Sequence, residues 1–424
     1  GSRRTLMTRT TLSDWLSWQQ SLHPSAIDLG LTRVHRTLKR LGWRQPECPV
    51  ITVAGTNGKG SCVAMLNSIL TAAGYRVGTF TSPHLIRYNE RIVVAGQEAS
   101  DASLIAAFER IDEARAEDTL TFFEFNALAA LLIFETAGLD AIVLEVGLGG
   151  RLDAVNAVDA DVALVTSISL DHCEWLGDDV EAIGREKAGI FRSGRLAVFA
   201  SADMPNSIED QADATGAKLL RSGRDFSYTR NLEEWSLQGP KRKLSGLPNP
   251  ALQGDVQFDN AAAVLTVLEL LSDRLPVGSD AINAGLRRVR LAGRFQRFKR
   301  KADWILDVAH NPGAAQTLAM QLASETGRKI AVCGILADKD IDGIVGALRE
   351  TFTEWIVTGL TGERALAPQA LAERIAAQGV QVAAVASGVR EACELAEEMS
   401  TQSDVIVVFG SFLTVGPALE WLTR

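Results

Sequence analysis

A glycine-rich turn between an apolar run and a helical pattern is the feature that most constrains this chain. The run Val50–Ala54 is β-branched and apolar, which is typical of a buried strand. Three glycines follow between Gly55 and Gly60, and apolar positions then recur at helical spacing over 63–73. Such a turn directs backbone N–H groups and the positive end of a helix dipole to one point. The segment therefore predicts a parallel α/β fold that binds a phosphate chain at this turn.

The side chains of the turn support the same interpretation. Lys59 supplies a mobile cation, and Ser61 or Thr56 supplies a hydroxyl for phosphate or magnesium. The spacing differs from the standard P-loop, because two residues rather than four precede the Gly58-Lys59 pair and a further glycine precedes Ser61. The alternative is a glycine turn with an exposed lysine. The strand before the turn and the helix after it favour phosphate binding.

Composition excludes several classes of protein. The chain has 424 residues, of which 46% are hydrophobic and 22% charged, a length that suggests two or three domains. A net charge of −9 disfavours a nucleic-acid surface. No run approaches the roughly 18 apolar residues that span a membrane. The five cysteines are scattered without a CxxC pair, so we expect reduced thiols and a cytoplasmic protein rather than a disulfide or zinc framework.

Polar side chains stand where several predicted strands end. Ser82 and His84 follow a strand over 76–81, Glu145 ends an apolar run over 140–145, and His172 follows a strand over 161–168. Ligands bind at the carboxyl ends of strands in open α/β sheets. Three of the five histidines occupy such positions, His310 being the third, and this favours a site over isolated structural histidines.

Two glutamates allow two interpretations each, and one lysine allows a plain structural one. Glu145 suits a magnesium carboxylate, or an ion pair with Arg151, and the two are compatible. Glu124 lies among phenylalanines, so it is either a buried carboxylate that needs a partner or a first-turn acid that complements a helix dipole. Lys187, on composition alone, is an exposed helical lysine.

A second β/α alternation begins after residue 295. A strand over 304–309 ends at His310, and further strands are predicted over 329–336, 355–358, 380–385 and 405–409. The segment 201–250 is polar with weak strands and is expected to be a surface excursion. We therefore expect a P-loop-type parallel-sheet ATPase domain over residues 1–295 and a smaller Rossmann-like α/β domain over 296–424.

The motifs, taken in order, resemble the folylpolyglutamate synthase family of the Mur-ligase-like enzymes. The resemblance extends over nearly the whole chain. It rests on 55–61, 82–84, 145–153, 171–172, 184–190, 293–295 and 307–312. A loop near the start resembles the pteroate-contacting loop of members that also act on dihydropteroate. That loop consists of Ile27, Asp28, Leu29 and Gly30.

The resemblance implies an ATP-dependent carboxylate–amine ligase of folate biosynthesis and one-carbon metabolism. ATP would phosphorylate a carboxylate, and the amine of L-glutamate would attack the acyl phosphate. The acceptors would be 7,8-dihydropteroate and reduced folates. The nearest alternative is a folylpolyglutamate synthase without the dihydropteroate activity. A cell-wall Mur ligase, and a nucleotide-binding module without ligase chemistry, are less favoured because the phosphate loop comes early and all expected metal ligands are present.

The resemblance also implies roles for individual residues. Lys59, Lys187 and His172 would be catalytic, and Lys187 would be carbamylated. Magnesium ions, two in number, would be held by Ser82, Glu145, His172 and the modified Lys187. The implied nucleotide contacts are Asn57, Gly58, Lys59, Gly60, Ser61, Asn260, Arg294 and Asp307. The implied pterin-substrate contacts are Thr121, Phe122, Phe123, Glu124, Leu152, Asp153 and Ala154, together with the loop over 27–30.

Some properties stay open at this stage. The placement of Arg294 and Asp307 implies that the domains close over ATP and exclude water from the acyl phosphate. We expect a monomer whose partners are small molecules, without nucleic acid or membrane. The glutamate pocket, the length and linkage of the glutamate chain, the preferred folate and the role of His310 cannot be assigned.

Overall fold

The glycine-rich turn lies at the centre of an eight-stranded sheet. The computed structural model describes residues 8–424. In it, β1 (Val50–Ala54) pairs in parallel with β5 (Ala141–Glu145) on one side and β6 (Val162–Val165) on the other. The strand order is β4-β3-β2-β5-β1-β6-β7-β8. The remaining strands are β2 (Val77–Phe80), β3 (Ile92–Val94), β4 (Gln97–Glu98), β7 (Leu196–Phe199) and β8 (Lys218–Arg221). β3 pairs antiparallel with β2 and with β4, and the other pairs are parallel.

Helices cover both faces of this sheet, which is why its central strands are continuous apolar runs. One face packs against α3 (Lys59–Ala72), α9 (Val256–Leu270) and α10 (Ser279–Arg288). The other face packs against α1 (Leu12–Leu22), α2 (Thr32–Leu41), α4 (Asp101–Ala114), α5 (Phe122–Glu135) and α8 (Asn206–Thr215). Short elements complete this part, namely η1 (Tyr88–Arg91), η2 (Ala154–Ala157), α6 (Cys173–Leu176), α7 (Val180–Lys187) and η3 (Ala188–Ile190).

The segment 201–250 is more ordered than the sequence predicts. It contains α8 and β8, followed by an antiparallel sheet of β9 (Ser227–Arg230), β10 (Glu234–Gln238) and β11 (Lys243–Pro248). The weak strands are thus confirmed, but the interpretation as a mere surface excursion is wrong. Trp235 is buried against Phe258 of α9, with ring centroids 5.7 Å apart, so the small sheet extends the core.

A second sheet begins at residue 296. Its order is β12-β13-β17-β14-β15-β16, and only β12 is antiparallel to its neighbour. The strands are β12 (Gln296–Lys299), β13 (Asp303–Leu306), β14 (Lys329–Cys333), β15 (Glu354–Thr358), β16 (Val382–Ala386) and β17 (Val405–Phe409). One face packs against α11 (Pro312–Leu322), α12 (Ile341–Leu348) and α13 (Pro368–Ala376), and the other against α14 (Val389–Met399) and α15 (Phe412–Leu422).

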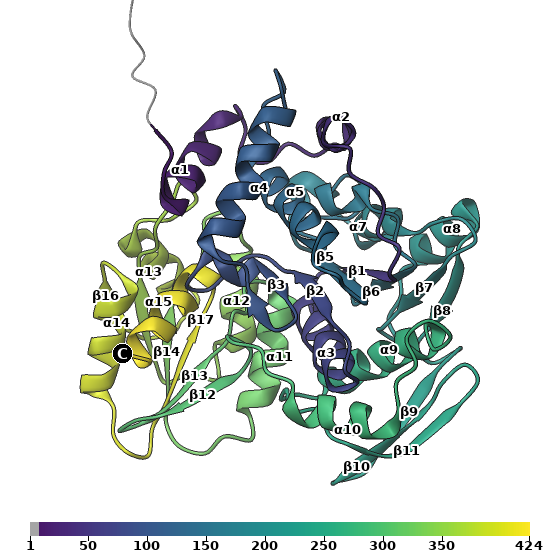
Figure 1. Ribbon diagram of the computed structural model, residues 1–424. Helices are drawn as coiled ribbons and strands as arrows, with labels where there is room; N and C mark the ends of the chain where they lie inside the picture. Colours follow the sequence, from purple (N-terminus) through teal and green to yellow (C-terminus); the bar gives the residue numbers. More distant parts are fainter. Residues whose placement is uncertain (1–7) are drawn as a thin grey trace, which may run out of the picture.

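The two sheets lie side by side, the second to the left in the view of Figure 1. The loops that follow β1, β2, β5 and β6 of the first sheet, and those that follow β13, β14, β15 and β17 of the second, line a common cavity. The carboxyl ends of both sets of strands therefore meet there, as expected for a ligand site. Within residues 8–424, none of the helices combines the length and apolar character needed to cross a bilayer.

Candidate active site

A cavity of about 810 Å³ lies between the two sheets, and most of the predicted site residues line it. The predicted residues on its wall are Ile27, Asp28, Leu29, Gly30, Asn57, Gly58, Lys59, Gly60, Ser82, Thr121, Phe123, Glu124, Glu145, Leu152, Asp153, Ala154, His172, Lys187 and Arg294. Four predicted residues are outside this lining among the described residues, namely Ser61, Phe122, Asn260 and Asp307.

The glycine-rich turn has the backbone that an anion site requires. Gly55 has a φ of 145°, and a side chain there would overlap the hydroxyl of Thr166. Thr166 donates a hydrogen bond of 2.6 Å to the carbonyl oxygen of Asn57, which fixes the turn against the strand beside it. The helix α3 then begins at Lys59 without a side-chain cap within the described chain. Its first N–H groups are consequently available to a ligand.

Ser61 and Asn260 lie behind the turn. The hydroxyl of Ser61 accepts a hydrogen bond of 3.2 Å from Gln257, and Asn260 donates one of 3.1 Å to the same Gln257 side chain. A methyl group on Gly58 would lie 3.0 Å from the Asn260 oxygen. In this structure Gln257 and Asn260 support the turn from α9, whereas Ser61 lies in the first turn of α3. The nucleotide contacts of Ser61 and Asn260 stay predictions.

Asp307 and Phe122 also lie outside the described cavity lining. The carboxylate of Asp307 accepts backbone hydrogen bonds from Phe295 and Ala309, at 3.0 and 2.9 Å. The ring of Phe122 lies 5.4 Å below the guanidinium of Arg91. Asp307 therefore ties the residue before β12 to the loop that follows β13, and Phe122 packs behind the wall that Thr121 and Phe123 form.

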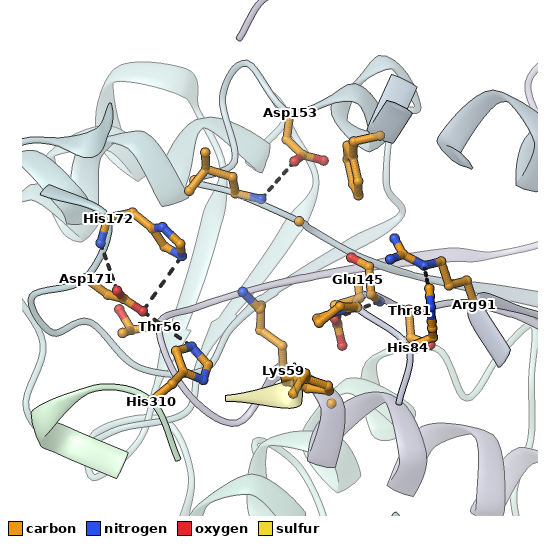
Figure 2. Close-up of a pocket in the computed structure, with 18 of the residues that line it drawn as sticks. Thr56, Lys59, Thr81, His84, Arg91, Glu145, Asp153, Asp171, His172 and His310 are labelled. Atoms are coloured by element: carbon orange, nitrogen blue, oxygen red, sulfur yellow. Dashed lines mark hydrogen bonds and ion pairs between the residues drawn. The ribbon is translucent and has the colours of Figure 1, made fainter. Parts of the chain in front are cut away.

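Glu145 places a buried carboxylate in the cavity at the end of β5. Its oxygen accepts a hydrogen bond of 3.2 Å from the backbone of Ser82. Burial raises the pKa of Glu145, and the charge of Lys59 opposes that rise. Figure 2 shows the Lys59 side chain between Glu145 and the group formed by Asp171, His172 and His310.

The ion pair of Glu145 with Arg151 is a wrong interpretation. Arg151 pairs instead with Glu186, with an N–O distance of 3.0 Å, and its side chain is 54% exposed. Glu145, the last residue of the central strand β5, is buried. Arg151 lies on the exposed loop that follows, so the two side chains do not pair.

Of the three unmodified side chains predicted to bind a divalent cation, two are the oxygen donors that magnesium prefers. Among the side chains that the structure describes, no three from His, Cys, Asp or Glu are grouped as a metal site. The predicted set offers the Glu145 carboxylate, the Ser82 hydroxyl and the imidazole of His172. Burial lowers the pKa of His172 to about 4, so its ring is neutral at pH 7 and keeps a free lone pair. A buried carboxylate with a single backbone hydrogen bond among the described contacts fits a nearby hard cation.

Lys187 is buried at the end of α7, so the interpretation as an exposed helical lysine is wrong. Burial lowers its pKa to about 7, and the neighbouring charge of Lys59 acts in the same direction. A methyl group on Gly150 would lie 2.8 Å from the carbonyl oxygen of Lys187, so the loop that follows β5 packs closely against this helix end. Near neutral pH a large fraction of the Lys187 amine is therefore uncharged and nucleophilic.

Asp171 connects the two sheets, although the sequence assigned it no role. One oxygen lies 3.1 Å from the ammonium of Lys339, and the other lies 3.7 and 3.8 Å from the rings of His310 and His172. Burial alone would raise the pKa of Asp171, but the charges of His172, Lys339 and His310 lower it to about 2. Asp171 follows β6 and Lys339 follows β14, so this pair crosses the cavity.

A second contact crosses the cavity at the glycine-rich turn. The side chains of Asn57 and Asn311 exchange hydrogen bonds of 3.2 and 2.9 Å. Asn311 also caps α11 by accepting from Ala314 at 2.9 Å. The turn is thus joined directly to the first helix after β13.

Sequence reasoning missed Lys339 and Arg91. Arg91 is a buried guanidinium in the cavity wall that donates to His84 at 2.8 Å, and burial together with this cation lowers the pKa of His84 to about 4. Neither Lys339 nor Arg91 lies within one of the sequence motifs described above. The only available signal for Lys339 was its place in the loop that follows a predicted strand.

Both interpretations of Glu124 are confirmed. Its oxygen accepts from the backbone N–H of Thr121 at 2.9 Å while the Thr121 hydroxyl accepts from Glu124 N–H at 3.1 Å, which makes a capping box at the start of α5. Its partner is Arg33, at 3.0 Å. Its contact with a substrate stays a prediction.

Asp153 lies on the cavity wall near α5. Its carboxylate accepts backbone hydrogen bonds from Leu148 at 2.9 Å and from Val155 at 3.2 Å. Burial nevertheless raises its pKa to about 6. The site can therefore hold this carboxyl group either protonated or ionised within the neutral range.

Comparisons with known proteins agree along the whole chain. Residues 53–267 match the model of the Mur ligase middle domain, and residues 293–412 match that of the Mur ligase glutamate ligase domain. The dihydrofolate synthase/folylpolyglutamate synthase of Escherichia coli (strain K12) is 44% identical over 99% of this chain and 97% of its own length. That of Mycobacterium tuberculosis is 32% identical over 92% and 90%.

Solved structures give the same result. Escherichia coli FolC in complex with DHPP and ADP superposes with a TM-score of 0.92 at 43% identity, covering 98% of each chain. A bifunctional folylpolyglutamate synthase/dihydrofolate synthase with Mn, AMPPNP and L-glutamate bound superposes with a TM-score of 0.90 at 44% identity, again covering 98% of each chain.

Proposed function

The chain belongs to the dihydrofolate synthase/folylpolyglutamate synthase group of the Mur ligase family, and from this we propose that it adds L-glutamate to 7,8-dihydropteroate and to reduced folates at the expense of ATP. The reaction proceeds through an acyl phosphate that the amine of glutamate attacks. The observation that carries the proposal is the cavity. The glycine-rich turn, the buried carboxylate of Glu145 and the loop over 27–30 all line it.

The residues of the turn would act on the phosphates. The free N–H groups at the start of α3 and the ammonium of Lys59 face the place where negative charge develops as the phosphoryl group leaves ATP. Fixed donors in a site sheltered from water stabilise such charge strongly. Arg294 lies on the cavity wall beside Gly60, with its guanidinium 3.9 Å from the position of a Gly60 methyl group, and adds a second cation.

The enzyme uses ATP and a divalent metal, which we propose to be magnesium. Ser82, Glu145 and His172 would hold the ion, with a modified Lys187 at a second position. The bound ion supplies positive charge that offsets the phosphate oxygens. Glu145 would supply the negative charge at the first position, and a bound cation would offset the burial that raises the pKa of this carboxyl group.

Lys187 is proposed to carry a carbamate. The neutral amine attacks carbon dioxide, forms a C–N bond and loses one proton to water, which leaves an anionic carboxylate on the nitrogen. The pKa of about 7, caused by burial, keeps enough neutral amine for this step. Lys59, the neighbour whose charge opposes a second ammonium, would favour an anion at the same place.

The second sheet is proposed to close the site against water and to hold glutamate. Lys339 and Arg364 stand on its side of the cavity, as does His310. Cations on that wall suit an amino acid that carries two carboxylates. We also propose the boundary between the ATP-binding and the ligase domains at residues 295 and 296, and a monomeric enzyme.

Phosphate release with ATP, Mg²⁺ and L-glutamate tests the function. The assay is run once with dihydropteroate and once with a reduced folate monoglutamate. Release with both acceptors, dependent on glutamate in each case, is the expected result. Release with the folate alone would support the alternative, a folylpolyglutamate synthase without the dihydropteroate activity. Release with neither acceptor would contradict both.

A further inference from the structure

Two walls of the cavity are joined by one arginine. The loop over 26–30 forms one wall, and the start of α5, with Thr121 and Phe123, forms another. Arg33, in the first turn of α2, reaches both. Its Nε and Nη2 atoms lie 3.1 and 3.0 Å from the two oxygens of Glu124, and Nη1 and Nη2 lie 3.2 and 2.7 Å from the carboxylate and carbonyl oxygens of Asp28.

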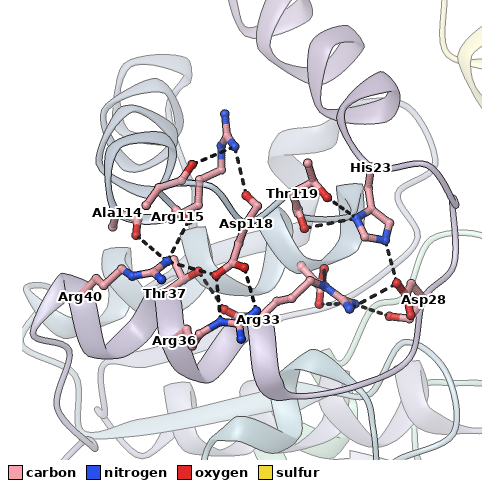
Figure 3. Close-up of polar contacts among 12 residues, drawn as sticks. His23, Asp28, Arg33, Arg36, Thr37, Arg40, Ala114, Arg115, Asp118 and Thr119 are labelled. Atoms are coloured by element: carbon pink, nitrogen blue, oxygen red, sulfur yellow. Dashed lines mark hydrogen bonds and ion pairs between the residues drawn. The ribbon is translucent and has the colours of Figure 1, made fainter.

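The same loop is held from its other side by His23. The ring Nε2 donates to the carboxylate of Asp28 at 2.7 Å, and the ring Nδ1 lies 2.8 Å from the hydroxyl and 3.2 Å from the carbonyl oxygen of Thr119. Figure 3 shows Asp28 between His23 and Arg33. Thr119 lies two residues before the capping box of α5, so both contacts of Asp28 lead back to the start of that helix.

The loop has little other support. Residues 27–31 are only partly buried and adopt no helix or strand. A backbone hydrogen bond of 3.2 Å from Gly30 to Leu152 is its tie to the loop that follows β5. Glu124 is 4% exposed at its side chain and Arg33 is 19% exposed, so their pairing is sheltered from water and geometrically specific.

We propose that Arg33 is a positioning residue for dihydropteroate. Arg33 is outside the cavity lining formed by residues 8–424, so it acts through Asp28 and Glu124 and not by contact. It sets the separation between the loop and the Thr121–Phe123 wall, and hence the width of the slot into which a flat ring can slide. The inference rests on the proposed function, because it takes dihydropteroate as the occupant of that slot.

Arg36 provides a matched control on the same helix. It also makes a two-point contact with a carboxylate, since its Nε and Nη2 lie 3.0 and 2.7 Å from the oxygens of Asp118. Its side chain is 49% exposed, and Asp118 lies outside the cavity lining formed by the described residues. Arg36→Met removes the same kind of contact from α2 without touching the slot.

Steady-state kinetics on the full-length enzyme test the proposal. In Arg33→Met, the KM for dihydropteroate is expected to rise about tenfold to a hundredfold. A displacement of about 1 Å in a group that positions the substrate has effects of that order. The KM values for ATP and L-glutamate and the kcat are expected to stay within about twofold. Arg33→Lys should fall in between, since an ammonium keeps the charge but lacks the planar fork. Arg36→Met should match the wild type within about twofold.

Asp28→Asn keeps the proposal testable if Arg33→Met does not fold. It weakens the tie on the loop side and leaves the Arg33–Glu124 pair intact, so the KM for dihydropteroate should rise in the same selective way. If the KM for dihydropteroate in these variants equals that of Arg36→Met, the role of Arg33 is overturned. An equal fall in kcat for every substrate would also overturn it, because that is the effect of a structural arginine. A wild-type enzyme that turns over reduced folate but not dihydropteroate would overturn the assignment of the slot itself.

Discussion

Lys59 is the residue whose position most directly suggests catalysis. It begins α3, lines the cavity and lies close enough to Glu145, His172 and Lys187 to influence all three pKa values. Lys59→Ala is expected to lower kcat by about a hundredfold to a thousandfold, the usual cost of losing one fixed group that stabilises charge in the transition state. Rates of ATP-dependent phosphate release measure this effect. The exposed Lys299→Ala serves as a control, and wild-type turnover in Lys59→Ala would contradict the role of the turn.

Lys187 allows a chemical test of the proposed carbamate. Lys187→Ala should depress ligation, and small carboxylic acids added to the assay should restore part of the rate by occupying the space of the missing carboxylate. In the wild type, labelled bicarbonate should give a carbamate signal by NMR that the variant lacks. An unaffected rate in Lys187→Ala would remove this part of the mechanism.

Asp153 predicts a pH dependence of stability. Its pKa of about 6 in the folded protein is above the ordinary value of 3.8, so the native state binds this proton more tightly than the unfolded state does. The stabilisation is fully present below pH 3.8 and is lost as the pH rises through about 6. Relative to Asp153→Asn, the free energy of unfolding of the wild type should fall by about 2–3 kcal/mol across that range. Urea unfolding of both proteins at several pH values measures the difference, and a constant difference would refute the prediction.

At the scale of elements, α10 shows how a helix can depend on one small residue. A methyl group on Gly285 would lie 2.6 Å from the Cα of Ile69, so α10 approaches the backbone of α3 at this point. Gly285→Ala is expected to lower the free energy of unfolding by about 1–3 kcal/mol through overpacking. Gly346→Ala in α12 should instead raise it by about 0.5–1 kcal/mol, because no atom lies within 4 Å of the added methyl and alanine favours a helix. Thermal or urea unfolding of the pair gives the comparison.

The same helix illustrates what the sequence could predict about the fold. Parallel strands that are buried on both faces form nearly continuous apolar runs, and such runs can be recognised in the sequence. β1, β5 and β17 are examples. The helix α10 was missed because its polar residues and Gly285 give weak local signals, and its formation depends on the surface of α3. The edge strand β12, with the sequence Gln-Arg-Phe-Lys, was missed for a related reason, since it is half exposed and pairs only with β13.

The site was predictable only as far as strand ends could be recognised. Glu145 and His172 follow directly from the rule that ligands bind at the carboxyl ends of strands. The partners of other carboxylates at the site lie far away in sequence. Arg33 is separated from Glu124 by 91 residues, and Lys339 from Asp171 by 168. Pairings at such separations depend on the packed structure, and no local pattern carries them.

For the whole molecule, the contact between Asn57 and Asn311 predicts how the two sheets are coupled. Asn311→Ser keeps a side-chain cap for α11 but is too short to reach Asn57. Loss of two neutral hydrogen bonds is worth on the order of 1–2 kcal/mol, so backbone N–H groups of the turn over 55–60 should exchange with solvent about tenfold faster. Exchange in β15, which is remote from this contact, should not change. Equal rates in the turn of both proteins would show that the contact does not couple the sheets.

The position of β17 has a consequence for the protein while it is being made. The strand follows β14, β15 and β16 in the chain, yet it lies between β13 and β14 in the second sheet, and the residues after it line the cavity. A nascent chain can therefore complete the first sheet on the ribosome and still lack one wall of the site. Ligands that bind only the finished cavity stabilise only molecules in which β17 has been inserted. Insertion of β17 between two strands made before it is then the event that commits a newly synthesised molecule to activity.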